Sequence, residues 1–269
     1  MATQTASSSA ISPAVKRQIT NIVALGAVLT INALANILPL NGVTTGEASD
    51  TFPSLFTPAG YVFSIWGLIY ALLIVFVVYQ ARPSQKDNPR LTRLGYWFAV
   101  SCVFNFSWLF AWHYGAIWLS ELLMLGILTS LIVCYLRLGI GEQMVPRTEA
   151  WAVRLPFSVY LGWITVATVA NTSVTLLEYG VTGGWLAPLW TLIAITAALG
   201  IGYLMLRNRR DAAFNLVLVW AFVGIAAQQW GAELLVVVGA LVAAALASFF
   251  IAQMLLKQGR FASSLTKET

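Results

Sequence analysis

The sequence predicts an all-α integral membrane protein with eight transmembrane helices. Of the 269 residues, 59% are hydrophobic and only 9% are charged, and the mean hydropathy is +0.80. Soluble domains carry about 25% charged residues. The apolar stretches are continuous and end at short polar connectors, which is typical of helices and not of the alternating pattern of a membrane β-barrel.

The apolar stretches are each about 20 residues long, which is the length that a helix needs to cross the hydrocarbon core. Very short turns join two pairs of them, around His113 to Gly115 and around Trp230 and Gly231, so we expect two tight antiparallel hairpins. The predicted spans are 18–40, 60–80, 94–112, 116–136, 154–175, 185–206, 212–229 and 233–256.

The basic residues support the number of spans and predict the orientation. All 15 Lys and Arg lie before the first span, in the even connectors or after the last span. The odd connectors carry only acids, namely Glu47, Asp50, Glu178 and Glu233. Because cytoplasmic loops of membrane proteins are enriched in Lys and Arg, both termini are predicted to be cytoplasmic. A bacterial inner membrane is the simplest location, and this charge distribution argues against nucleic acid as a partner.

The ends of the chain are predicted to lie outside the membrane. Residues 1–17 form a Ser/Thr/Ala-rich segment that we expect to be a disordered cytoplasmic N-terminus. Residues 257–269 are predicted to be a cytoplasmic tail. Cys102 and Cys134 both fall within spans, where packing is a more natural role than a disulfide.

Aromatic and polar residues recur at helical spacing on three spans. Residues three, four and seven apart share one face of a helix, and the predicted topology places these faces in the noncytoplasmic half of the bilayer. Such a face can be a packed seam between helices or the wall of a site for a flat, apolar ligand. The faces comprise Phe63, Trp66 and Tyr70 in the second span, Asn105, Trp108 and Trp112 in the third, and Tyr160, Trp163, Ala167 and Asn171 in the fifth.

Glu121 is the only acid placed clearly inside a span. A charged carboxylate at mid-bilayer costs roughly 2.5–3.5 kcal/mol on insertion scales, so Glu121 should face the bundle interior and find a hydrogen-bond donor or stay protonated. Asn105, Asn32, Asn36 and Trp indole groups are the predicted partners. A purely structural role and a ligand-binding role both remain open for Glu121.

Other polar and aromatic residues have simpler interpretations. His113 is predicted to be solvated in its turn, since no second His and no metal-ligand spacing accompanies it. No nucleophile–base pair, phosphate loop or dinucleotide fingerprint is found. We expect the tryptophans near span ends to lie at the membrane interface; they are Trp97, Trp112, Trp118, Trp151, Trp185 and Trp230.

The sequence runs that carry these faces, called stripes below, resemble motifs of the TspO/MBR family, the tryptophan-rich sensory proteins related to the mitochondrial translocator protein. The resemblance covers residues 18–178 and implies a five-helix bundle with a pocket under the first external loop. The matching runs are Phe56-Thr-Pro-Ala-Gly-Tyr-Val-Phe-Ser-Ile-Trp66 with Tyr70, Asn105-Phe-Ser-Trp108, Glu121 early in the fourth helix, and Tyr160-Leu-Gly-Trp163-Ile-Thr-Val-Ala167-Thr-Val-Ala-Asn171.

This resemblance implies a function as well as a fold. Family members bind tetrapyrroles such as protoporphyrin and haem, and some bind sterols; some bacterial members are reported to promote porphyrin breakdown, and others act as regulators. The implied ligand-binding residues are the ten of the stripes and the fourth helix: Phe63, Trp66, Tyr70, Asn105, Trp108, Glu121, Tyr160, Trp163, Ala167 and Asn171.

The chain departs from the family pattern at several positions. Ala59 replaces the second Pro of a Pro-Pro pair, and Phe56 and Tyr61 replace the two flanking tryptophans. The step from Phe63 to Trp66 is one residue shorter than in the family. After Asn171 the chain lacks the Tyr-x-Arg/Lys ending of a cholesterol motif, which argues against sterol recognition.

Residues 179–256 form three additional helices that the motifs do not explain. The last one carries small residues, Gly239, Ala243 and Ala247, on one face, which favours close helix packing. A lid, the surface of a homodimer and a second lobe are all open as roles for these helices.

Three functions follow in order of support. The first is a receptor or sensor for a planar hydrophobic ligand, with a porphyrin or haem as ligand and no required cofactor; its other partner is membrane lipid. The alternative is a small-molecule or proton-coupled transporter that uses Glu121. An enzyme acting on porphyrins ranks last, because it rests on the family resemblance alone.

Overall fold

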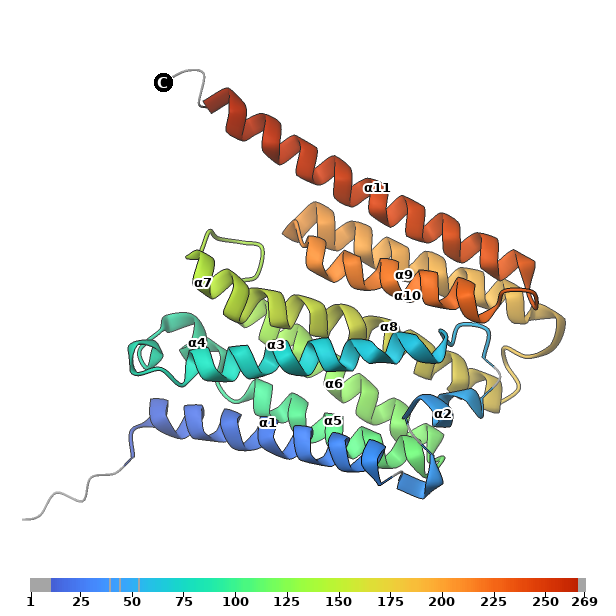
Figure 1. Ribbon diagram of the computed structural model, residues 1–269, viewed down its shortest axis with the longest axis horizontal. Helices are drawn as coiled ribbons and strands as arrows, with labels where there is room; N and C mark the ends of the chain where they lie inside the picture. Colours follow the sequence, from blue (N-terminus) through green and yellow to red (C-terminus); the bar gives the residue numbers. More distant parts are fainter. Residues whose placement is uncertain (1–10, 39, 44, 53, 266–269) are drawn as a thin grey trace, which may run out of the picture.

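The computed structural model describes residues 11–38, 40–43, 45–52 and 54–265, and every regular element in this part of the chain is a helix. Its long helices run alternately in opposite directions, so α1 begins and α11 ends at the same end of the bundle (Figure 1). They are α1 (Pro13–Ile37), α3 (Ile65–Gln80), α5 (Trp97–His113), α6 (Ile117–Arg137), α8 (Leu155–Glu178), α9 (Ala187–Arg209), α10 (Ala212–Gln228) and α11 (Leu234–Leu265).

The connectors contain short helices whose ends follow local capping chemistry. The backbone N–H of Val15 donates to Ser12 Oγ at the start of α1, and Asn88 caps α4 immediately before a proline. Asp211 caps α10 in the same way. The short helices are η1 (Leu40–Gly42), α2 (Thr45–Asp50), η2 (Gly60–Ser64), η3 (Pro83–Gln85), α4 (Pro89–Leu94), α7 (Arg147–Glu149), the π-helical η4 (Ala150–Arg154) and η5 (Gly184–Leu186).

The helices have the length and composition of membrane spans, which confirms the predicted class of all-α membrane protein. Among the described residues, six helical segments are long and apolar enough to cross a membrane. The two remaining long helices, α5 and α10, have 17 residues each. The six segments are Pro13–Ala35, Gly60–Gln80, Ile117–Arg137, Arg147–Glu178, Gly184–Arg209 and Leu234–Lys257.

Several predicted boundaries need correction. The first helix begins at Pro13, not at residue 18, because Ser12 and Pro13 supply an N-cap and a first turn. The fifth begins at Arg147, because α7, η4 and α8 are continuous. Helix α11 continues to Leu265, so most of the predicted tail 257–269 is helical. Residues 1–10 of the predicted disordered N-terminus and 266–269 of the tail lie outside the described residues.

Both predicted hairpins are present. Helices α5 and α6 are joined through Gly115, and α10 and α11 through Gly231, and both glycines have positive φ. A third tight connection, which the sequence did not reveal, joins α9 to α10 through Arg210 in the left-handed conformation. Cys102 and Cys134 are buried and free, in agreement with a packing role.

Helices α9, α10 and α11 lie together on one side of the other helices, next to α8 (Figure 1). Two glycines allow α10 to approach closely. A Cβ atom at Gly162 would lie 3.0 Å from the carbonyl oxygen of Phe214, and one at Gly224 would lie 2.2 Å from Val62 Cγ2. The three additional helices are therefore packed into the bundle and do not form a separate lobe.

Helix α10 also binds the chain that leads into α3. The N–H of Ala59 donates to the carbonyl of Gly224 at 3.1 Å, and Trp220 Nε1 donates to the carbonyl of Val62 at 3.1 Å. Gln229 Nε2 donates to the carbonyl of Leu55 at 3.3 Å. These bonds fix the segment that leads into α3 against α10, one of the three additional helices.

The small-residue face of α11 is used inside the chain. Ala243 and Ala247 are buried, and a Cβ atom at Gly239 would lie 2.2 Å from Leu192 Cδ2 on α9. This face therefore serves the close packing that the sequence predicts, with α9 as a partner.

The contact at Gly224 predicts a stability difference between two glycines. Gly224→Ala should lower the free energy of unfolding by about 1–3 kcal/mol, because the new methyl group overpacks Val62 and Pro58. Gly200→Ala on α9, where nothing lies within 4 Å, should be neutral or stabilising by up to about 1 kcal/mol. Unfolding of the purified protein in mixed micelles measures both. Equal behaviour of the two variants would contradict the packing of α10 on the entry to α3.

Candidate ligand-binding site

A small cavity lies among η2, α3, α5, α6 and α8, with a volume of about 30 Å³. Six of the ten predicted site residues line it: Phe63, Trp66, Trp108, Trp163, Ala167 and Asn171. The cover segment, residues 54–58, contributes Thr57 and Pro58. The other lining residues are Ser49, Trp112, Met124, Val166, Ala170 and Val174. The convergence of three aromatic stripes, expected from the sequence, is present.

Indole rings form two walls of this cavity. On one side Trp66 meets Trp163 edge to face, with ring centroids 6.2 Å apart, and Phe63 meets Trp163 in the same way at 5.8 Å. On the other side Trp108 and Trp112 are stacked, with centroids 5.9 Å apart and planes inclined by 21°. Ala167 and Ala170 of α8 leave room between the walls because they have the smallest side chains that still form helix well.

The shortened step from Phe63 to Trp66 is accommodated by a change of helix type. Phe63 lies in the 3₁₀ helix η2, and Trp66 lies in the first turn of α3. A 3₁₀ helix has three residues per turn, so side chains three positions apart stand one above the other. Phe63 and Trp66 thus both reach Trp163 despite the missing residue.

Asn171 is the centre of a fully bonded polar group beside the cavity. Its Oδ1 accepts a hydrogen bond from Trp108 Nε1 at 3.1 Å, and its Nδ2 donates to Ser120 Oγ at 3.1 Å and to Glu121 Oε2 at 2.8 Å. Thr172 donates to the other carboxyl oxygen of Glu121 at 2.7 Å. The carboxyl group is thereby satisfied by two neutral donors from one helix, α8.

Two of the predicted partners of Glu121, Asn105 and the Trp108 indole, donate to other residues. Asn105 donates instead to Tyr160 Oη at 3.1 Å, and it accepts from Asn32 Nδ2 at 3.3 Å. The reason is depth: the tight α5–α6 hairpin places Glu121 level with about residue 109, so Asn105 lies roughly one turn deeper. The side chain of Asn36, another predicted partner, lies outside the described residues.

Four predicted site residues do not line the cavity but contact residues that line it or residues next to them. Tyr70 stacks on Trp66 with ring centroids 5.5 Å apart, and Tyr160 meets Trp66 at 6.0 Å. Asn105 donates a hydrogen bond to Tyr160, and Glu121 accepts one from Asn171. These residues position the walls of the cavity.

Within the described part of the chain, two polar atoms of cavity-lining residues have no hydrogen-bond partner. They are Thr57 Oγ1 and Trp163 Nε1, in side chains that are 4% and 2% exposed. A buried polar group without a partner costs roughly 1–3 kcal/mol. Unsatisfied groups of this kind are rare in native interiors, and both of these belong to the same cavity.

His113 is buried, contrary to the prediction of a solvated turn residue. It is 3% exposed, and its Nε2 lies 3.2 Å from Thr45 Oγ1 while its Nδ1 lies 3.1 Å from the carbonyl oxygen of Leu40. Asn41 also donates to its backbone carbonyl. The first connector folds over the α5–α6 hairpin and encloses the imidazole, a tertiary contact that the local sequence does not indicate.

Trp112 is another correction. It was expected at the membrane interface, but it is 5% exposed, stacks on Trp108 and contacts Phe52 at 5.3 Å between ring centroids. Trp118, Trp151, Trp185 and Trp230 are exposed near helix ends, as predicted. Among the described residues no group of three His, Cys, Asp or Glu side chains could hold a metal ion.

Sequence patterns alone did not identify several lining residues. Thr57 and Ser49 lie in the connector before η2, where no periodicity applies. Met124, Val166, Ala170 and Val174 are ordinary apolar residues of membrane helices. Val166, Ala170 and Val174 are the members that the α8 stripe could have suggested, because each lies three or seven residues after Trp163, Ala167 or Asn171.

These features define a helical membrane protein with an aromatic cavity beneath its first connector. A family model for TSPO-like proteins matches residues 18–253. The chain therefore belongs to the TSPO-like family. The match extends beyond the motif-bearing region 18–178 and includes the three additional helices. No curated protein and no solved structure matches the chain.

The bonding of Asn171 predicts a difference between two substitutions on α8. Asn171→Leu should lower the free energy of unfolding by at least about 2 kcal/mol, because it leaves the Trp108 indole and one oxygen of Glu121 buried without partners. Thr172→Val removes a single donor and should cost about 1 kcal/mol. Denaturation in mixed micelles compares them, and losses of equal size would show that Asn171 is not the centre of the polar group.

Proposed function

We propose that this TSPO-like protein is a membrane receptor for a planar hydrophobic ligand of the tetrapyrrole class, bound in the aromatic cavity. The observation that carries the proposal is the pairing of two tryptophan walls with two unpartnered polar atoms, Thr57 Oγ1 and Trp163 Nε1. Aromatic faces bind flat rings through offset or edge contacts. The free N–H and O–H groups offer hydrogen bonds to acceptors on the rim of such a ring.

The ligand has to open the cavity in order to enter. Ligand sites have volumes of about 300–1,000 Å³, whereas this cavity has about 30 Å³. Among the described residues, the cover segment, residues 54–58, accepts one side-chain hydrogen bond from outside the segment, from Gln229 to the Leu55 carbonyl, and its Phe56 side chain is fully buried. Outward movement of this segment together with Phe63 would break the bonds from Ala59 to Gly224 and from Trp220 to Val62 and would enlarge the cavity. The structure thus corresponds to the closed state of the proposed receptor.

We propose further that all eight long helices cross the bilayer with both termini in the cytoplasm of a bacterial cell. Helices α5 and α10 have 17 residues each, or about 26 Å of helix, which comes close to a hydrocarbon core of about 30 Å. The alternation of the helices brings the Lys- and Arg-bearing segments to one end of the bundle, as the positive-inside rule requires.

Filling the space between the walls should abolish binding. Ala167→Phe is expected to weaken protoporphyrin binding at least tenfold, or about 1.4 kcal/mol, because the new ring occupies the position between the indoles. Ala71→Phe, on the exposed side of α3, is the matched control and should bind like the unmodified protein. Saturable quenching of tryptophan fluorescence measures both. Unchanged affinity in Ala167→Phe would place the ligand elsewhere.

Removing an unpartnered hydroxyl should weaken ligand binding without lowering the stability of the protein. Thr57→Val keeps the shape and deletes an unsatisfied group, so the free energy of unfolding should stay equal or rise by about 1 kcal/mol, while protoporphyrin affinity falls several-fold. Thr165→Val, which loses a bond to the Leu161 carbonyl, should lower stability and leave affinity unchanged. A separate measurement tests the enzyme alternative. The absorption spectrum of protein-bound porphyrin should stay unchanged in light and in the dark, and loss of the porphyrin bands would indicate that the protein degrades its ligand.

A further inference from the structure

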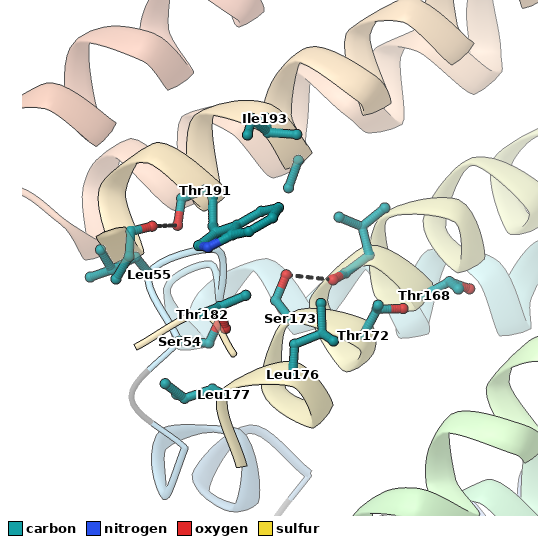
Figure 2. A pocket seen from close by; sticks show the side chains of 14 residues that line it. Ser54, Leu55, Thr168, Thr172, Ser173, Leu176, Leu177, Thr182, Thr191 and Ile193 are labelled. Atoms are coloured by element: carbon teal, nitrogen blue, oxygen red, sulfur yellow. Dashed lines mark hydrogen bonds between the residues drawn. The ribbon is translucent and has the colours of Figure 1, made fainter. Parts of the chain in front are cut away.

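A second, larger cavity lies between α8 and α9, beneath the first two residues of the cover segment, with a volume of about 250 Å³. Figure 2 shows Thr168, Thr172, Ser173 and Leu176 on one side, Thr191 and Ile193 on the other, and Ser54 with Leu55 at one end. One wall belongs to the first of the additional helices. The five helices that carry the family motifs could not form this cavity alone.

Its polar lining consists of hydroxyl groups and the indole N–H of Trp190. Three of the hydroxyls already donate to a carbonyl four residues earlier: Thr168 to Ile164, Ser173 to Val169 and Thr191 to Ala187, at 2.7, 2.7 and 2.9 Å. Thr172 donates to Glu121. A hydroxyl that has used its proton still has a free lone pair. Four of the six hydroxyls therefore present acceptors, while Ser54, Thr182 and the Trp190 indole can donate, and this acceptor-rich lining suits a ligand that brings O–H donors together with acceptor oxygens. The six hydroxyl residues are Ser54, Thr168, Thr172, Ser173, Thr182 and Thr191.

The rest of the lining is apolar and carries no charge. Leu176, Leu177 and Val169 line it on the α8 side, and the remaining residues of the wall include no Lys, Arg, His, Asp or Glu. An ionised phosphate or carboxylate would find no counter-ion here, and desolvating it without one is costly. A quaternary ammonium would supply no donor hydrogen.

The cavity opens sideways toward the surroundings of α9. Trp190 and Ile193, which line it, are 40% and 49% exposed. Both lie in a segment that is long and apolar enough to cross the membrane, so the adjoining medium is lipid. A ligand can then place its polar end among the hydroxyls and leave an apolar chain along α9.

We infer that this cavity binds a neutral single-chain amphiphile whose headgroup carries two or more hydroxyl donors, the chemistry of a monoacylglycerol. The acceptor-rich lining selects donors, the absence of charge in the wall selects a neutral head, and the lateral opening selects an apolar tail. The inference does not depend on what fills the aromatic cavity, since the two sites share no lining residue.

The test uses photo-crosslinking of the full-length protein with a diazirine-bearing monooleoylglycerol. Two probes with the same acyl chain serve as comparators, one with a phosphate head and one with a phosphocholine head. Saturable labelling by the glycerol probe is expected in peptides from 168–177 and 187–194, at least fivefold above either comparator. Equal labelling by all three probes would overturn the inference and indicate a nonselective lipid-facing groove.

A matched pair of substitutions tests the location. Ala194→Leu projects into the cavity and should reduce labelling by the glycerol probe at least fivefold. Ala197→Leu makes the same change on the exposed side of α9 and should have no effect. Thr191→Val, which removes one hydroxyl without added bulk, should reduce labelling in a folded protein even if Ala194→Leu disturbs packing. Labelling unchanged in both Ala194→Leu and Thr191→Val would refute the site, whereas protoporphyrin quenching should be normal in both.

Discussion

The burial of α8 among the other helices is the constraint on which the rest of this structure depends. Its membrane segment is 78% buried, while the other five candidate spans are 28–44% buried. In lipid, helices are held together by close packing and by hydrogen bonds, because burial from lipid gains no hydrophobic free energy. Helix α8 uses both means. Gly162 admits the backbone of α10, Asn171 and Thr172 bind Glu121 of α6, Tyr160 binds Asn105 of α5, and Ser158 donates to Asp211, which caps α10.

The sequence predicts what depends on helical period and misses what depends on how helices meet. The stripes on α5 and α8 converge because residues three and four apart share a face, and that geometry holds in any helix. The partners of Glu121 depend on the relative depth of two helices, which a single turn of offset changes. The 3₁₀ turn at Phe63 arises where the chain enters α3, and no composition signal marks it. The burial of His113 and Trp112 comes from the fold of the first connector over a hairpin, a contact between segments about 70 residues apart.

The additional helices change how the aromatic cavity is closed. In this chain the entry to α3 is bonded to α10 through Ala59, Val62 and Leu55. Two of the family's tryptophans near this entry are replaced here by Phe56, which is fully buried, and by Tyr61, which contacts Trp220 of α10 edge to face at 5.4 Å. Two of the departures from the family pattern thus contact a helix that the motif-bearing region lacks: Tyr61 through its ring, and Ala59 through a backbone N–H that a proline would not have.

The two cavities differ in the hydrogen bonds that they leave unmade, and one carboxyl group stands between them. The aromatic cavity holds a free indole N–H and a free hydroxyl, so it favours a ligand with acceptors. In the cavity beside α9, four of the six hydroxyls have already donated their protons, so its lining is richer in acceptors and favours a ligand with hydroxyl donors. Asn171 lines the first and Thr172 lines the second, because consecutive helical residues point about 100° apart. Both bind Glu121, one on each oxygen. A ligand that draws the Thr172 hydroxyl away in one cavity therefore changes the bonding of the carboxyl that holds Asn171 in the other.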